Sequence, residues 1–202
     1  MKKIFTLCLL SCSTMVFAQT ECNTTRYIDY NAFSGADVTS GVTFGNNRPV
    51  IVMAFGGSFI GGNRSQVAFL GNIFAKLGYV VVANDYRVGF FLPSQISTTL
   101  AVLRGSHDMK ACVRYLKKTV AEDGNPYGID PDRIIIGGVS AGAISAIHAA
   151  YLNLDSQVPA YMANDTAGLG GMEGNSGSPG YSSEPLAVLS FSGTIGDSSW
   201  ID

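Results

Sequence analysis

The chain has 202 residues, of which 47% are hydrophobic and 14% are charged, and its formal net charge is −2 at pH 7. This composition fits one globular domain, complete or part of a larger one. No basic residues cluster, which argues against a nucleic acid as partner.

The N-terminal segment, residues 1–18, has the pattern of a secretory signal peptide. Two lysines open a short apolar run, and Val16 and Ala18 occupy the small-residue positions of a cleavage site. The pattern predicts cleavage after Ala18 and a mature domain over residues 19–202, secreted or periplasmic, without a transmembrane segment. A lipoprotein signal that ends at Cys12 is the alternative.

Export decides how the remaining cysteines are interpreted. Cys22 and Cys112 stay in the mature chain as an even pair in an oxidising compartment. Cys112 lies on the apolar face of a predicted helix. Two interpretations stay open: a disulfide between Cys22 and Cys112, and a buried free thiol at Cys112 that packs like a small apolar side chain.

Apolar runs alternate with amphipathic segments along the chain. Strands that alternate with helices predict an α/β fold in which a mainly parallel sheet carries helices on both faces. The predicted strands are 25–30, 41–45, 48–55, 79–86, 133–136 and 185–193, and the predicted helices are 65–77, 94–120 with a break near Gly105, and a helix that starts at Ala141.

Residues 155–184 fit neither pattern and are rich in glycine. A loop of this length inside a compact domain is usually functional or disordered. It follows the helix after Ser140, so one interpretation is a loop or cap that folds over that serine. A surface insertion with no role is the alternative.

The sequence "GGVSAG" places Ser140 in a G-x-S-x-G pattern, between Gly138 and Gly142. A predicted strand precedes it and a predicted helix follows it. Such a turn strains the serine backbone and exposes the hydroxyl, as a nucleophile requires. A phosphate-binding glycine turn is disfavoured, because neither G-x-G-x-x-G nor a lysine after the glycines is present.

A second glycine pair follows the strand 48–55, in "MAFGGSFIGG". Acyl transfer needs backbone N–H donors aimed at the developing oxyanion. The amides of Gly56, Gly57 and Ala141 are the predicted oxyanion hole, with an ordinary glycine turn as the alternative.

These motifs, in this order, resemble the α/β-hydrolase superfamily, and in particular secreted carboxylesterases of the hormone-sensitive-lipase-like and carbohydrate-esterase type. The similar segments are "FGGSFIGG", "NDYR" and "YGIDPDRIIIGGVSAGA", within residues 45–195. The resemblance implies the α/β-hydrolase fold, Ser140 as nucleophile, Gly56, Gly57 and Ala141 in the oxyanion hole, and no metal or organic cofactor. It implies structural roles for Asp85 and Arg87.

The sequence departs from this family in two respects. Phe55 stands where the family has a histidine before the glycines. The triad order of the fold is serine, then acid, then histidine, whereas His107 precedes Ser140. His148 follows by eight residues on the same predicted helix, about 12 Å along its axis. Both histidines are therefore interpreted as packing or surface residues.

The missing base predicts that the chain is the N-terminal part of a longer esterase, with the triad histidine beyond residue 202. Asp197, after the last predicted strand, is a possible acid in a variant layout, and Glu173 is a weaker one. The predicted function is hydrolysis of carboxylic esters, either small esters or acetyl and feruloyl esters on polysaccharide. A non-catalytic binding module and a peptidase of the same fold are the alternatives.

Overall fold

The computed structural model describes residues 46–90, 92–157, 169–175 and 177–196. The predicted signal peptide, the predicted strands at 25–30 and 41–45, Cys22 and Asp197 lie outside these residues. The strands are β1 (Arg48–Ala54), β2 (Val80–Asn84), β3 (Ile129–Val139) and β4 (Ala187–Phe191), and the helices are α2 (Ala68–Lys76), α3 (Gln95–Glu122) and α4 (Ala141–Tyr151), with short 3-10 turns η2 (Arg64–Val67) and η3 (Asp155–Gln157).

The four strands form one parallel sheet in the order β2-β1-β3-β4. Strand β1 is central in the sheet: Val52 pairs with Val82 of β2 on one side and with Ile136 of β3 on the other. Its side chains from Val50 to Ala54 are almost completely buried. A strand covered on both faces reads as a continuous apolar run, which is why the sequence located β1 correctly.

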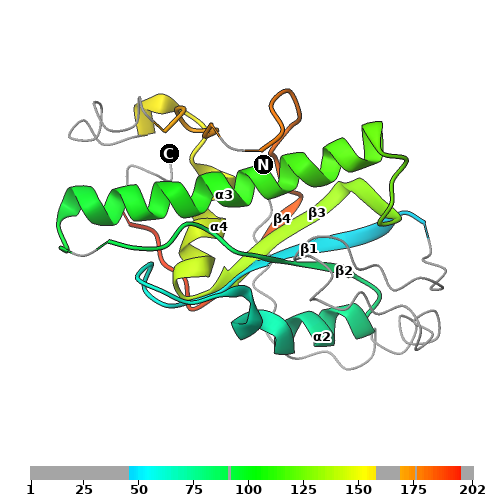
Figure 1. The fold of residues 1–202 in the computed structure, drawn as a ribbon, viewed down its shortest axis with the longest axis horizontal. Coiled ribbons are helices and arrows are strands. Elements are labelled where there is room, and N and C mark those ends of the chain that lie inside the picture. Colours follow the sequence, from blue (N-terminus) through cyan, green and yellow to red (C-terminus); the bar gives the residue numbers. More distant parts are fainter. Residues whose placement is uncertain (1–45, 91, 158–168, 176, 197–202) are drawn as a thin grey trace.

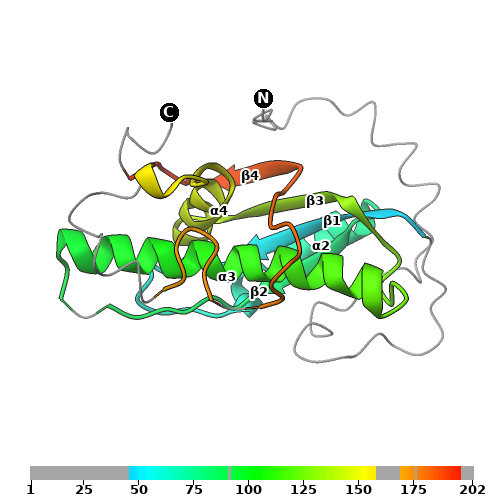
Figure 2. The same cartoon turned by 90° about the horizontal axis from the view of Figure 1, so that it is seen from above.

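Helices cover both faces of the sheet (Figures 1 and 2). Figure 2 shows α3 in front of the sheet and α2 behind it. Helix α4 packs beside α3 and against β3 and β4. The predicted parallel sheet with helices on both faces is confirmed.

Helix α3 is continuous from Gln95 to Glu122, so the predicted break near Gly105 is wrong. The helix begins at a capping box, in which the hydroxyl of Ser94 accepts from the Ser97 N–H at 3.1 Å. A Cβ added at Gly105 would lie 3.2 Å from the Cβ of Ser145 on α4, and nearer still to its hydroxyl. Gly105 therefore allows a close helix–helix approach and does not interrupt the helix.

Strand β3 begins at Ile129, four residues before the predicted start. Ile129 pairs with Arg48 of β1, and the Arg48 N–H donates to the Gly128 carbonyl at 3.0 Å. The register then shifts between Arg48 and Val50, where the Asp-Pro-Asp segment at 130–132 bulges. The Asp-Pro-Asp segment therefore forms a bulge inside β3 and does not mark the residue at which the strand begins.

The described part of the glycine-rich segment packs on helix α3. Lys110 of α3 donates to the carbonyls of Leu152 and Met172, at 3.0 and 2.9 Å, and Lys117 donates to the carbonyl of Glu184 at 2.9 Å. Residues 158–168 and 176 lie outside the described part. A cap over Ser140 stays a prediction.

Every helix in the described ranges is too short or too polar to cross a bilayer.

Candidate active site

Ser140 lies at the turn where β3 ends and α4 begins. Its backbone angles, φ 51° and ψ −117°, fall in a region that residues other than glycine rarely adopt. The turn is held on both sides: the Ser140 N–H donates to the Phe191 carbonyl at 2.8 Å, and the Ser140 carbonyl accepts from the Ile144 N–H at 2.9 Å. A half-buried serine in a strained turn between a parallel strand and a helix has the backbone geometry of a presented nucleophile.

The two glycines that flank Ser140 are required by close backbone packing. A Cβ at Gly142 would lie 2.5 Å from the carbonyl oxygen of Phe55 and even nearer to that of Ala54. A Cβ at Gly138 would lie 2.7 Å from the Ala54 carbonyl oxygen. The first turn of α4 therefore rests directly on the end of β1, and only glycine allows that contact.

The loop after β1 lies against the nucleophile turn. A Cβ at Gly56 would be 3.3 Å from the Cβ of Ser140, so the backbone of Gly56 approaches the serine closely. Gly57 adopts φ 122° and is exposed, and its carbonyl accepts from the Ile60 N–H at 3.0 Å in a tight turn. Ala141 is buried directly after Ser140. The structure thus brings Gly56 and Ser140 together, and the oxyanion-hole role of the three amides stays a prediction.

Phe55 fills the position where the resemblance expects histidine. Its buried ring stacks on Tyr86 with centroids 4.4 Å apart and planes inclined by 20°. The Tyr86 hydroxyl donates to the Phe55 carbonyl at 2.9 Å, and burial raises the pKa of Tyr86 to about 12, so this donor keeps its proton. Aromatic packing therefore fixes the start of the glycine loop in place of a histidine hydrogen bond.

Asp85 and Arg87, the charged pair of "NDYR", form ion pairs with neighbouring elements. Asp85 accepts from the Arg64 N–H at 2.7 Å and pairs with its guanidinium at 3.2 Å. Arg87 pairs with Asp108 of α3 at 3.0 Å. These contacts agree with the structural roles that the resemblance implies.

Both histidines are buried packing residues. His107 lies on α3 beneath the glycine-rich segment, and burial, together with the charges of Lys110 and Arg87, lowers its pKa to about 4. His148 lies on α4, where Nδ1 contacts the Ile144 carbonyl at 2.7 Å and Nε2 accepts from the Gly196 N–H at 3.3 Å. Burial lowers the pKa of His148 as well.

Glu173, the weaker acid candidate, is engaged elsewhere. Its carboxylate pairs with Lys110 at 3.0 Å and with Arg114 at 2.8 Å, and it accepts from the Ser183 hydroxyl at 3.0 Å. These hydrogen bonds and positive charges lower its pKa against the opposing effect of burial. In the structure this carboxylate fastens the segment to α3.

Cys112 is a half-buried free thiol on α3. Burial raises its pKa to about 12, which keeps the thiol protonated and unreactive. Cys22 and Asp197 both lie outside the described residues, so the disulfide and the variant acid stay predictions.

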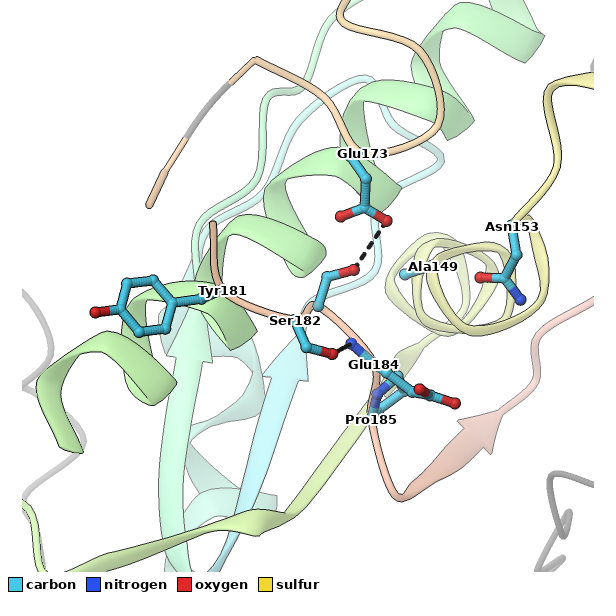
Figure 3. Close-up of a pocket in the computed structure, with 8 residues that line it drawn as sticks. Ala149, Asn153, Glu173, Tyr181, Ser182, Glu184 and Pro185 are labelled. Atoms are coloured by element: carbon cyan, nitrogen blue, oxygen red, sulfur yellow. Dashed lines mark hydrogen bonds between the residues drawn. The ribbon is translucent and has the colours of Figure 1, made fainter. Parts of the chain in front are cut away.

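One pocket, of about 430 Å³, lies on the flank of α4 and not at Ser140 (Figure 3). Its lining includes both polar and apolar side chains, and Ser140 is not part of it. Figure 3 shows Glu173 at one end of the pocket, while Tyr181 points away. The Glu173 carboxylate accepts from the Ser183 hydroxyl at 3.0 Å. The lining residues are Ala149, Asn153, Glu173, Tyr181, Ser182, Ser183, Glu184 and Pro185.

Within the described ranges no three histidine, cysteine or carboxylate side chains gather as a metal site would need. The sequence analysis missed two contacts of the nucleophile region: the Phe191 carbonyl that receives the Ser140 amide, and the link from His148 to Gly196. No local pattern signals either contact, since the partners come from separate elements.

A protein-family model described as BD-FAE matches residues 37–176. Fumonisin B1 esterase of Sphingopyxis macrogoltabida is 32% identical over 106 residues, which cover 47% of this chain and 18% of that protein. Bile salt-activated lipase of Mus musculus is 34% identical over 110 residues, which cover 50% of this chain and 17% of that protein. The matched segments thus span less than a fifth of these curated relatives.

Solved esterase structures share the fold. Esterase 2 of the Planctomycetes species Thermogutta terrifontis, with propionate bound, superimposes with a TM-score of 0.54 at 25% identity, over 76% of this chain and 47% of that one. The same esterase phosphorylated by paraoxon gives a TM-score of 0.52 at 23% identity, over 79% and 54%.

Proposed function

Because the chain belongs to the BD-FAE family and has the α/β-hydrolase fold, we propose that it hydrolyses carboxylic esters with Ser140 as nucleophile. The observation that carries the proposal is the strained turn at Ser140 with the backbone of Gly56 packed against it. This arrangement places a hydroxyl nucleophile next to a glycine loop whose amides can face an oxyanion.

The proposed reaction has two steps. The Ser140 hydroxyl attacks the ester carbonyl while a general base takes its proton, and the N–H groups of Gly56, Gly57 and Ala141 stabilise the oxyanion. The alcohol leaves with that proton, and an acyl-enzyme remains. Water then attacks the acyl group, returns a proton to Ser140 and releases the acid.

The mechanism also requires a general base that takes the proton of Ser140. His148 is buried on α4, about two helical turns after Ser140. Backbone groups contact both of its ring nitrogens. His107 is buried under the glycine-rich segment. We propose that the triad histidine and its acid lie C-terminal to residue 202, with Asp197 as the alternative acid.

The substrate class follows from the relatives. Their names describe esterases and lipases, and one structural relative holds propionate. We propose small carboxylic esters as substrates, with polysaccharide-linked esters as a second class for an exported protein. Export itself rests on the signal pattern of residues 1–18.

A fluorophosphonate probe, which reacts with activated serines, tests the nucleophile. We expect Ser140 to be labelled in the full-length protein, which includes the proposed base, and the Ser140→Ala variant of that protein to take up no probe. Ser145→Ala is the matched control, since Ser145 is a fully buried serine on the same helix. Labelling that survives Ser140→Ala would mean that the reactive nucleophile is another residue, whereas a folded full-length protein that takes no probe would favour a non-catalytic module of the same fold.

A further inference from the structure

The chain leaves the sheet next to the nucleophile. The last residue of β4, Phe191, receives the Ser140 N–H on its carbonyl at 2.8 Å. Ser192 then adopts φ 61°, which turns the chain out of the sheet. A Cβ at Gly193 would lie 2.8 Å from the Cβ of Ala143, so the departing segment runs directly over the first turns of α4. We call residues 192–196 the exit segment.

The far end of the exit segment is attached to α4 by His148. The Nδ1 atom of His148 lies 2.7 Å from the Ile144 carbonyl, which only a protonated nitrogen can satisfy. In a neutral ring Nε2 is then the acceptor, and it receives the Gly196 N–H at 3.3 Å. Burial favours this neutral ring, because it lowers the pKa of His148.

The exit segment is therefore fixed at both ends, by Ser140 at one end and by His148 at the other. A segment of five residues that follows Phe191, which is bonded to Ser140 just before α4, and that is bonded to α4 at Gly196 has little freedom to move away from the nucleophile turn. The hydrogen bond that holds the Ser140 amide depends on the position of Phe191, and Phe191 is followed directly by this segment. Loosening the His148 end consequently loosens the support of the strained serine.

We propose that His148 is a positioning residue for the nucleophile, which it serves by holding the exit segment against α4. The effect of His148 on the reactivity of Ser140 rests on the proposed function, whereas its attachment of the exit segment to α4 does not. A neutral imidazole can hold the exit segment because its Nδ1–H donates to the Ile144 carbonyl of α4 while its Nε2 accepts from the Gly196 N–H. A hydrophobic side chain of similar size would fill the space and make neither bond.

The test compares two histidine-to-phenylalanine changes in the full-length protein. His148→Phe removes both hydrogen bonds, and His107→Phe is the matched control, since His107 is also fully buried but lies on α3. His148→Gln restores a donor and an acceptor. The measurements are the rate of fluorophosphonate labelling at Ser140, hydrogen–deuterium exchange of the exit segment, and the melting temperature.

We expect His148→Phe to slow labelling by about tenfold or more relative to His107→Phe at a comparable melting temperature, because small displacements in a nucleophile cost large factors in rate. Exchange should rise in the exit segment of His148→Phe alone, and His148→Gln should recover both signals. Equal labelling rates in the two Phe variants, or unchanged exchange at 192–196, would overturn the proposal. If the full-length wild-type protein takes no probe, the proposed function fails, and the exchange comparison alone decides the role of His148.

Discussion

At the residue scale, the main feature is a serine held in angles that cost about 1–3 kcal/mol. Ser140 keeps them because its amide and carbonyl are both bonded, to Phe191 and to Ile144. The flanking glycines leave no room for any side chain between the first turn of α4 and the end of β1. The strain is thus supported by backbone contacts from three separate elements.

Gly142→Ala should destabilise the protein, because its new Cβ would lie 2.5 Å from the Phe55 carbonyl oxygen and closer still to that of Ala54. Backbone atoms cannot move aside as a side chain can, so we expect a loss of at least about 1–3 kcal/mol in the free energy of unfolding. Gly61→Ala is the control, since a Cβ there meets nothing within 4 Å. Urea unfolding measures both, and equal stabilities would contradict the packing argument.

Much of the candidate site was predictable at this scale. The motif around Ser140 and the glycines at 56 and 57 are local patterns with a local geometric meaning, so sequence alone located them. The contacts of Ser140 with Phe191 and of His148 with Gly196 join residues about fifty positions apart. Nothing in either segment indicates its partner, because the pairing is set by the order of strands in the sheet.

At the element scale, α3 and the glycine-rich segment are joined by buried cations. Lys110 and Arg114 are nearly inaccessible, with side-chain exposures of 2% and 4%, and both pair with Glu173, which is 57% exposed. The predicted apolar face of α3 is correct at Met109, but the helix also buries these two charges. Lysine and arginine in a helix usually indicate a solvated face, so the sequence pattern concealed this contact.

Glu173→Gln should loosen the segment from α3, since it leaves two buried cations without their carboxylate. Breaking a fully buried pair costs about 3–5 kcal/mol, and the partial exposure of Glu173 reduces the expected loss to about 1–3 kcal/mol. Glu184→Gln is the matched control, because Glu184 contributes its backbone carbonyl to Lys117. Chemical denaturation separates the two variants, and a neutral Glu173→Gln would show that the pair contributes nothing.

Gly71 of α2 and Gly105 of α3 should respond to alanine in opposite directions. At Gly71 of α2 a Cβ would make an ordinary contact, 3.6 Å from Val81, so Gly71→Ala should stabilise by about 0.5–1 kcal/mol through helix propensity. At Gly105 the Cβ would press on Ser145, at 3.2 Å from its Cβ, and we expect overpacking to outweigh that gain.

Thermal unfolding of the two variants measures the difference, and Gly105→Ala combined with Ser145→Gly should recover part of the loss. A stabilising Gly105→Ala would instead contradict the close packing of Gly105 against Ser145. The prediction of a break used propensity alone, which tertiary packing overrode.

At the scale of the whole molecule, the sequence predicted the layer architecture because the strands are fully buried apolar runs. It could not give the strand order, which depends on long-range pairing, and it misplaced the start of β3, where pairing with Arg48 outweighs the turn chemistry at 130–132. The molecule contains two histidines, and both are buried with a lowered pKa. Their titration therefore acts on the stability of the entire fold.

The free energy of unfolding should decrease as the pH falls from about 6.5 to 4. His107 has a pKa of about 4 in the folded state and about 6.5 when unfolded, so in this window the unfolded chain binds a proton that the folded chain excludes. The stability is fully present above pH 6.5, and His107 alone accounts for a loss of about 3 kcal/mol toward pH 4. Urea unfolding of wild type and His107→Phe at pH 7.5 and 4.5 isolates this effect, and parallel losses in the two proteins would contradict it.

The four parallel strands all end at the same edge of the sheet, where α4 begins. Each strand end passes into its own connection, and neighbouring connections are bonded to one another: Asp85 after β2 binds Arg64 after β1, and Phe191 at the end of β4 binds the Ser140 amide. Exchanging or lengthening one connection therefore also changes the contacts of the connection beside it. For directed evolution, the contacting residues after β1 and β2 should be varied together, whereas Gly56, Gly57, the exit segment and the glycines beside Ser140 must be held constant in any library.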